Sequence, residues 1–194
     1  LEFRRVLFRS TMSIEDTPHS GERPTREISV TVNGEEVTRE VEPRLKLSDF
    51  LRNECDLQGV RVGCEHGVCG ACTVSLDGDT VKSCLLYAVQ AEDLAVETVE
   101  GLAEDGQLHP VQEAFHEEHA LQCGFCTSGF VMATKSLLEE NPDPDREEVK
   151  EGLADNICRC TGYQNIYRAV DRAADKLSAD VEPVRTGGDD EEGA

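Results

Sequence analysis

The spacing of the cysteines constrains this chain more than any other feature of its sequence. Cys64, Cys69 and Cys72 follow the pattern C-x4-C-x2-C, and Cys84 comes after eleven intervening residues. This is the ligand spacing of plant-type 2Fe–2S ferredoxins. Three glycines lie among these cysteines, where glycine lets a loop curve tightly and brings backbone N–H groups toward sulfur. They are Gly63, Gly67 and Gly70.

Two other kinds of metal site could use the same residues. Structural zinc sites bind four thiolates but usually pair the cysteines as C-x2-C twice, whereas Cys64, Cys69 and Cys72 crowd into one loop. A Rieske-type cluster needs histidines on one iron, and His66 is followed by no matching Cys-x2-His. We therefore interpret the first set as the ligands of a 2Fe–2S cluster and His66 as an ordinary loop residue. Zinc stays as an alternative.

A second set of four cysteines follows in the rest of the chain. Cys123-x2-Cys126 is separated by thirty-one residues from Cys158-x-Cys160. We interpret this set as joining the start of one helix to the end of another, and helix N-termini favour thiolates. A cluster held in this way would pin two helices together, so metal binding would contribute to folding.

Three further residues could be mistaken for metal ligands. Cys55 lies on the apolar side of a predicted helix, where a free cysteine usually packs as a small hydrophobe. His116 and His119 are three residues apart in a Glu-rich segment. This spacing could bind a metal, but we interpret the pair as part of a solvated helix face.

The composition of the chain indicates its cellular compartment and disfavours some classes of binding partner. The nine cysteines, with no secretory signal and no apolar run long enough to cross a bilayer, indicate metal binding in a reducing cytoplasm and no membrane anchor. A net charge of −21 disfavours nucleic acid and anionic lipid as partners. It fits a salt-rich cytoplasm or simply a well-solvated surface.

Alternating apolar residues predict strands in the first half of the chain. Two hairpins are expected, around the turns Asn33-Gly34 and Asp77-Gly78. Residues 47–51 carry apolar side chains at helical spacing, and residues 94–99 suggest one more short strand. Strands folded around one helix predict an α+β domain over residues 27–100.

Residues 101–178 have the apolar period of helices instead. Pro110 begins the first predicted helix, and residues 130–138 form the second. Asp143-Pro144 supplies the N-cap and first residue of the third, and residues 166–177 form the fourth. Four helices with short connections predict a small four-helix bundle.

The two ends of the chain are not expected to fold. The segment 5–10 back-translates readily into a common sequencing-adaptor sequence and is soon followed by Met12, so we interpret residues 1–10 as an artefact. The rest of residues 1–26 is polar and predicted to be a disordered leader. Residues 179–194 form an acidic, Gly-rich tail that we expect to be mobile.

Three motifs together resemble a known family. They are GCEHGVCGAC at 63–72, QCGFC at 122–126 and CRCTGY at 158–163. This combination resembles the iron–sulfur small subunit of the molybdenum hydroxylases, which include xanthine dehydrogenase, aerobic carbon monoxide dehydrogenase and aldehyde oxidoreductases. The resemblance covers residues 27–177, and all eight ligand positions are matched.

The resemblance implies a β-grasp ferredoxin domain followed by a four-helix domain, each with a 2Fe–2S cluster. It implies that electrons leave a molybdopterin cofactor in a large subunit, enter the cluster of the helical domain, pass to the ferredoxin-type cluster and reach FAD in a medium subunit. Gln122 and Cys160 match positions that hydrogen-bond the pterin in relatives. A side-chain amide suits that task because it both donates and accepts.

The sequence departs from the family pattern at a few positions, none of them a ligand. Ser128 stands where many relatives have proline, and Asp155 stands where glycine is frequent. The run at 160–166, CTGYQNI, looks most like the carbon monoxide dehydrogenase type, although enzymes with other substrates share it.

The leading function is therefore an electron-transfer subunit that performs no bond chemistry itself. One alternative is a free two-cluster ferredoxin, and an exposed apolar surface around Gln122 and Cys160 would argue against it. Another is a zinc-stabilised interaction module, which would be colourless.

Overall fold

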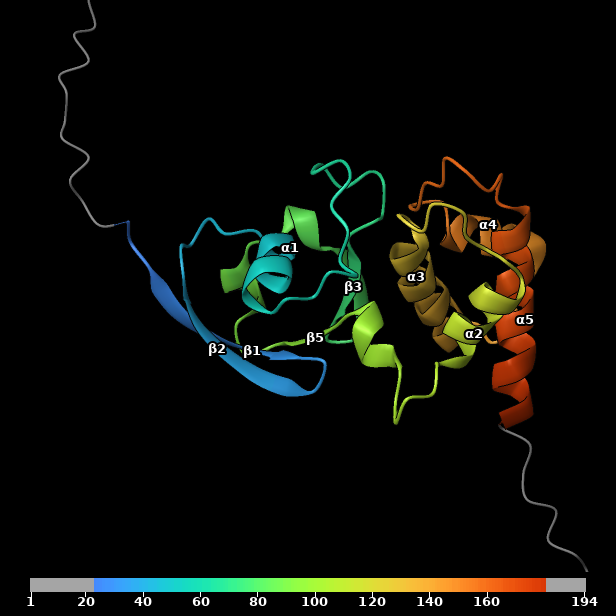
Figure 1. The fold of residues 1–194 in the computed structure, drawn as a ribbon, viewed down its shortest axis with the longest axis horizontal. Helices are drawn as coiled ribbons and strands as arrows, with labels where there is room; N and C mark the ends of the chain where they lie inside the picture. The colour runs from blue at the N-terminus through green and yellow to red at the C-terminus, as the bar shows by residue number, and fades with distance from the viewer. Residues whose placement is uncertain (1–22, 181–194) are drawn as a thin grey trace, which may run out of the picture.

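The structure is a computed structural model that describes residues 23–180. A five-stranded sheet lies at one end of an elongated molecule and a group of helices lies at the other (Figure 1). The strands are β1 (Arg26–Val32), β2 (Glu35–Val41), β3 (Thr73–Leu76), β4 (Asp79–Lys82) and β5 (Ala95–Glu97). Their order is β2-β1-β5-β3-β4, with β1 parallel to β5 and the other neighbours antiparallel. The predicted leader and tail lie outside the described residues, apart from a few at their inner ends.

Both predicted hairpins are confirmed, and their turns explain why. Asn33 and Gly34 have φ values of 50° and 84°, and Asp77 and Gly78 have values of 51° and 96°. Positive φ at both turn residues is the requirement of a two-residue turn whose twist matches that of the strands. The second hairpin pairs Thr73 with Lys82, which fixes the positions of the residues just outside it.

The sheet packs against one short helical segment. The helix α1 (Leu47–Asp49) continues into a π-helical turn at Phe50–Glu54, and Leu47, Phe50 and Leu51 are fully buried. They meet the inward side chains of β1, as the alternation predicted. Cys55 packs against the same core, in agreement with its interpretation as a small hydrophobe.

Four helices form the other end of the molecule, as predicted. They are α2 (Pro110–Glu117), α3 (Thr127–Glu140), α4 (Arg146–Gly152) and α5 (Gln164–Asp180). Phe115, Phe130 and Ile166 are among the buried side chains of a hydrophobic core separate from that of the sheet. The α+β fold with a helical second half is therefore confirmed, while the division at residues 100 and 101 stays a prediction.

The predicted start of α4 was wrong by two residues. The N-cap is Asp145, whose carboxylate accepts hydrogen bonds from the N–H groups of Glu147 and Glu148 at 2.8 and 3.0 Å. Glu148 accepts in return from the N–H of Asp145 at 2.7 Å. This reciprocal capping box satisfies more backbone donors than the Asp143-Pro144 pair could, so the helix begins later.

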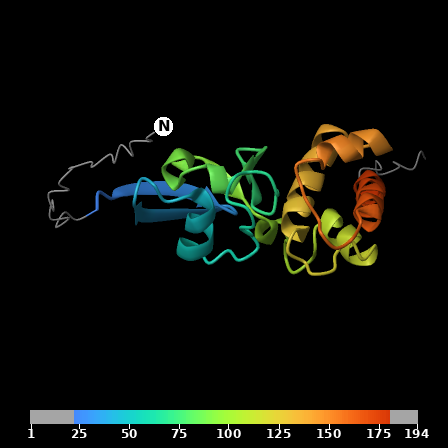
Figure 2. The ribbon, with the colours of Figure 1, turned by 90° about the horizontal axis from the view of Figure 1, so that it is seen from above.

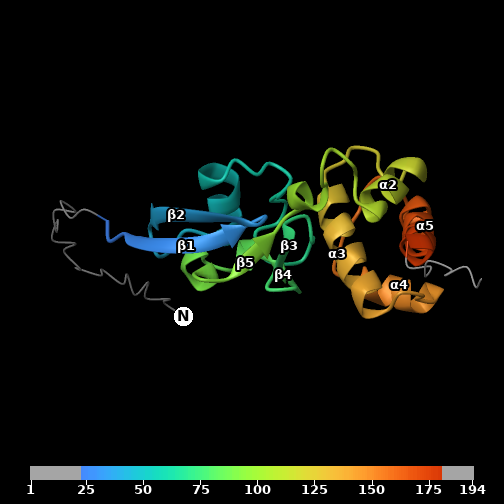
Figure 3. The same ribbon diagram turned by 90° about the horizontal axis from the view of Figure 1, so that it is seen from below.

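The two ends of the molecule meet through α3. This helix lies next to β3 and β4 (Figures 2 and 3). Lys135 of α3 forms an ion pair with Glu97 of β5 at 3.1 Å. At the other end of the helix, a Cβ atom on Gly129 would lie 2.1 Å from the carbonyl oxygen of Gly70. Only glycine allows this approach, so α3 sits directly on the loop that carries the first cysteines.

Candidate iron–sulfur centres

The hairpin of β3 and β4 brings two cysteines of the first set together. Cys72 precedes β3, and Cys84 lies in a 3₁₀ turn at Ser83–Leu85 after β4. Ser83 closes the ladder by donating to the carbonyl of Cys72, from its N–H at 3.3 Å and from its hydroxyl at 2.8 Å. Both cysteines are buried. Burial, and next the neighbouring Cys72 thiol, raise the pKa of Cys84 to about 11.

Cys64 and Cys69 lie in the loop before β3, where backbone N–H groups surround sulfur. The N–H groups of His66 and Cys69 lower the pKa of Cys64 to about 6, and the N–H of Cys69 is 3.4 Å from the Cys64 Sγ. The loop reaches this shape with Gly67 and Gly70 at φ values of 81° and 70°. Such a nest of N–H groups stabilises anionic sulfur.

The second set comes together from two loops. Cys126 is the N-cap residue of α3, and the Sγ of Cys123 lies 3.5 Å from the Sγ of Cys160. Burial, and next the Cys158 thiol, raise the pKa of Cys126 to about 12. The predicted position of Cys158 and Cys160 at the end of a helix was wrong. Both lie in the loop between α4 and α5, because α4 ends at residue 152.

That loop is anchored by its own polar side chains. Thr161 donates to the Cys158 Sγ from its hydroxyl at 3.1 Å and from its N–H at 3.4 Å. The N–H of Cys158 donates to the Tyr163 hydroxyl at 3.0 Å. The Tyr163 ring packs between Phe130 and Tyr167, so Cys158 is held in place by the bundle core.

The thiols of each set come together as two pairs, the arrangement that the ligands of a binuclear cluster need. Within residues 23–180, no group of three or more His, Cys, Asp or Glu side chains is arranged to hold one metal ion. Each thiol is hydrogen-bonded to one other thiol of its set, and charge interactions join the two pairs of a set. The pairs are Cys64 with Cys69, Cys72 with Cys84, Cys123 with Cys160 and Cys126 with Cys158. A 2Fe–2S cluster needs two thiolates on each iron.

Two buried hydroxyl groups beside the second set have no partner in the protein. Thr127 and Ser128 follow Cys126 directly, and the hydroxyl oxygens of both are buried without a hydrogen bond. A buried polar group normally has a partner. Unpaired donors at this place suit an anionic group bound next to Cys126, so the residues present fit a cluster.

The two cysteine loops touch each other. The N–H of Ile157 donates to the carbonyl of Cys69 at 3.0 Å, and the side-chain amide of Asn156 donates to the carbonyl of Gly70 at 3.1 Å. Sequence reasoning missed Asn156. Its position two residues before Cys158 was the one feature of the sequence that pointed to it. Its partner, Gly70, lies 86 residues earlier in the chain, and a local sequence pattern does not predict a contact over that distance.

The remaining candidate residues lie at the surface. Gln122 and Cys160 are exposed, and the contact between Cys123 and Cys160 brings them to the same surface region. His66 is exposed and its Nδ1 contacts the Cys64 carbonyl at 2.5 Å. His116 and His119 are also exposed, as expected of solvated side chains. The prediction that they share a helix face was wrong, because α2 ends at residue 117 and His119 has a φ of 50°.

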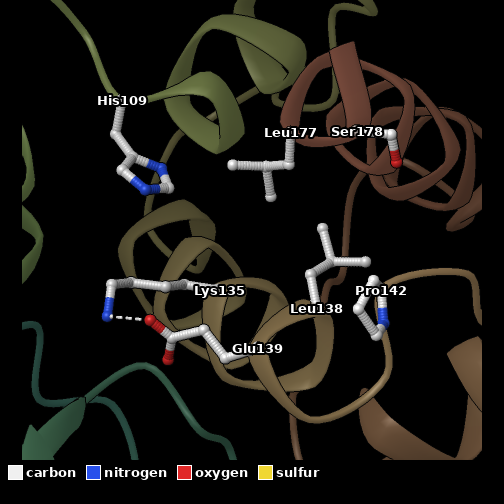
Figure 4. Close-up of a pocket in the computed structure, with 7 residues that line it drawn as sticks. All are labelled: His109, Lys135, Leu138, Glu139, Pro142, Leu177 and Ser178. Carbon is white, nitrogen blue, oxygen red and sulfur yellow. Dashed lines mark hydrogen bonds and ion pairs between the residues drawn. The ribbon is translucent and has the colours of Figure 1, made fainter. Parts of the chain in front are cut away.

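A cavity of about 440 Å³ lies elsewhere, between the C-terminal parts of α3 and α5 (Figure 4). It is lined by His109, Lys135, Leu138, Glu139, Pro142, Leu177 and Ser178. Lys135 is nine residues along α3 from Cys126, or roughly 13 Å at the helical rise. The residues that line the cavity include no cysteine. No helix among residues 23–180 is long and apolar enough to span a bilayer.

Two family models match the chain, one for each half. A model described as "2Fe-2S iron-sulfur cluster binding domain" matches residues 30–103, and one described as "[2Fe-2S] binding domain" matches residues 98–171. The first match includes Cys64, Cys69, Cys72 and Cys84, and the second includes Cys123, Cys126, Cys158 and Cys160.

Several characterised proteins are similar to the chain over most of their length. The nicotine 6-hydroxylase small subunit of Paenarthrobacter nicotinovorans is 54% identical over 79% of this chain and 92% of its own. The caffeine dehydrogenase subunit gamma of Pseudomonas sp. (strain CBB1) is 53% identical over 74% and 87%. A chain of quinoline 2-oxidoreductase from Pseudomonas putida 86 matches with a TM-score of 0.77 and 47% identity, over 82% and 99%. The chain belongs to the family of iron–sulfur small subunits of the molybdenum hydroxylases.

Proposed function

We propose that this subunit moves electrons one at a time from a molybdopterin on a large partner subunit to FAD on a medium partner subunit. The observation that carries the proposal is the direct contact between the two cysteine loops, from the N–H of Ile157 to the carbonyl of Cys69. It connects the backbones of the two candidate redox centres directly. The two bound 2Fe–2S clusters would supply reversible one-electron chemistry.

The cysteines of each set would act as the ligands. The first centre would be held by Cys64, Cys69, Cys72 and Cys84, and the second by Cys123, Cys126, Cys158 and Cys160. The N–H groups around Cys64 and the hydroxyl of Thr161 at Cys158 donate to sulfur. Such donors hold the thiolates in place and stabilise negative charge.

Exposed apolar side chains are the expected contacts with partner subunits. Seven large hydrophobic side chains are exposed among the described residues, and six lie on or beside the cysteine loops. We name Val68, Leu85 and Tyr87, beside the first set of cysteines, the first docking surface. We name Leu121, Gln122, Ile157 and Cys160, beside the second set, the second docking surface. Phe125 lies between the two, because its ring also contacts Arg61 next to the first cysteine loop. Exposed apolar side chains that are concentrated in one region of a protein indicate a protein–protein interface. Their concentration near the cysteine loops therefore disfavours a free ferredoxin.

The second docking surface includes the residues that would meet the pterin. Gln122 and Cys160 are exposed there, and an exposed side-chain amide can both donate to and accept from a heterocycle. Cys160 would be a ligand and a pterin contact at once, which shortens the electron route. The large subunit would therefore cover the second docking surface and the FAD subunit the first.

The substrate would be bound by the large partner subunit and not by this chain. The relatives named above act on nicotine, caffeine and quinoline by their names, and all three are nitrogen heterocycles. We propose that the complex that contains this subunit also acts on a nitrogen heterocycle. The likeness of residues 160–166 to the carbon monoxide dehydrogenase type stays a prediction, as does a cytoplasmic location.

Anaerobic purification of the full chain tests the two-centre proposal. We expect about four irons and four acid-labile sulfides per chain, a brown colour, and two EPR signals after reduction with dithionite. Zinc in place of iron, or a single signal with half the iron, would contradict the proposal.

A further inference from the structure

The loop that carries Cys69 is held partly by the helical half of the molecule. The carbonyl of Gly70 accepts from the N–H of Thr73 at 3.2 Å, from the Thr73 hydroxyl at 2.8 Å and from the Asn156 amide at 3.1 Å. The bonds from Thr73 belong to the same turn. The bond from Asn156 spans 86 residues of sequence, and Asn156 is only 3% exposed, so water does not compete for it.

Two successive peptide groups are oriented by these contacts. The carbonyls of Cys69 and Gly70 both point at residues 156 and 157, and no described peptide bond is cis. In a trans peptide the N–H points opposite to the carbonyl. The N–H groups of Gly70 and Ala71 therefore point away from the helical half. Both lie in the sequence between Cys69 and Cys72, two ligands of the proposed first centre.

The peptide group of Gly70 is closely packed by the helical half. A Cβ atom on Gly70 would lie 2.4 Å from the carbonyl oxygen of Asp155, and one on Gly129 would lie 2.1 Å from the Gly70 oxygen. The start of α3 and the loop before Cys158 thus enclose this peptide group. Two side chains donate to its carbonyl, Thr73 from the same turn and Asn156 from the helical half.

We propose that Asn156 is a positioning residue for the first centre: by holding the Gly70 carbonyl, it keeps the N–H of Ala71, in the same peptide group, directed at the sulfur of a bound cluster and raises the reduction potential of that centre. The inference rests on the proposed function, because it assumes that the first four cysteines hold a cluster. Its physical basis is that N–H donors to sulfur stabilise the extra negative charge of the reduced state. A residue beside the ligands of the second centre would thereby tune the first.

The test is an EPR-monitored redox titration of the iron-loaded full chain. Asn156→Ala removes the donor, and Asn156→Asp keeps the shape of the side chain but replaces the donor with an acceptor. Cys123→Ser, which removes a ligand of the second centre only, assigns the two signals. We expect both Asn156 variants to keep their iron and to show a tenfold lower reduced-to-oxidised ratio of the first centre at a fixed potential, equivalent to about 59 mV.

Asn33→Asp is the matched control. The Asn33 side chain is also an amide bonded within the structure, to Thr98 at 2.8 and 3.1 Å, and it makes no bond to the cysteine loops. Its replacement should leave both potentials unchanged. An unchanged first potential in iron-replete Asn156 variants, or an equal shift in Asn33→Asp, would overturn the inference.

Two further results separate the inference from the proposed function. Loss of iron in both Asn156 variants would also overturn the inference, because Asn156 would then be needed for folding and not for the potential. If the unmodified chain lacks two iron–sulfur signals, the proposed function itself fails.

Discussion

The N–H of Ile157 donates a hydrogen bond to the carbonyl oxygen of Cys69, with 3.0 Å between nitrogen and oxygen. Ile157 is the residue before Cys158. The bond therefore links the loop that carries Cys158 to the loop that carries Cys69, and both cysteines are candidate ligands. Beside this link, α3 comes close to the Gly70 carbonyl at Gly129. The two halves of the chain are therefore joined at their cysteine loops.

Replacing Cys123 with serine should remove the second centre alone. Cys123 belongs to the pair with Cys160, whereas the first set is built from the β3–β4 hairpin and its preceding loop. We expect iron to fall from about four to about two per chain, with one EPR signal retained and a less stable helical half. Disappearance of both signals would mean that the two centres do not form on separate parts of the fold.

A charge on the first docking surface should weaken binding of the flavin partner. Leu85 is 58% exposed, so Leu85→Glu costs little in folding but places a carboxylate in an apolar contact. We expect about a tenfold higher Kd for the FAD subunit, as for an interface residue of moderate importance, measured by calorimetry or co-purification. Leu108→Glu is the control, since Leu108 is 49% exposed and lies away from the cysteine loops. Equal weakening by both would contradict the assignment.

Gly129→Ala should destabilise the contact between α3 and the first cysteine loop. The new methyl group would lie 2.1 Å from the Gly70 oxygen, and overpacking of this kind costs about 1–3 kcal/mol. Thermal unfolding followed by circular dichroism checks this. In Gly152→Ala the new group meets the end of the Leu137 side chain at 2.9 Å, which can move aside. The prediction fails if Gly152→Ala is the more destabilising of the two.

The stability of the chain should fall between pH 7 and pH 5 in a manner that depends on His109. Burial, and next the positive charge of Lys135, lower the pKa of His109, while Glu97 and Glu139 oppose the shift. A lowered pKa means that the unfolded chain takes up the proton first, so stability is full above about pH 6.5 and is lost as the pH falls toward the folded pKa. Protonation also removes the Nδ1 acceptor that caps α2.

His109→Asn isolates this effect, because asparagine keeps a capping oxygen but does not titrate. Denaturant unfolding at several pH values should give a shallower acid dependence in the variant than in the unmodified chain. Parallel curves would contradict the role of His109.

The sequence predicted the elements of this fold well because its signals are local. The turns at Asn33-Gly34 and Asp77-Gly78 need positive φ, and the residues there supply it. The start of α4 was misplaced because two Asp residues compete as N-caps, and only the capping box between Asp145 and Glu148 decides between them.

The candidate site was predictable in its residues but not in its contacts. The cysteine spacing alone indicated two sets of four ligands. The pairing of Cys72 with Cys84 depends on hairpin register, and the contact of Asn156 with Gly70 joins positions far apart in the chain. No periodicity encodes such long-range contacts, so both needed the structure.

Affinity purification of this chain from its native cells, with iron, molybdenum and flavin assayed on the eluate, tests the central claim most directly. We predict about four irons per copy of this chain together with two larger subunits, one carrying molybdopterin and the other FAD. The same iron content on a solitary chain, with neither molybdenum nor flavin, would contradict the claim and make the protein a free electron carrier.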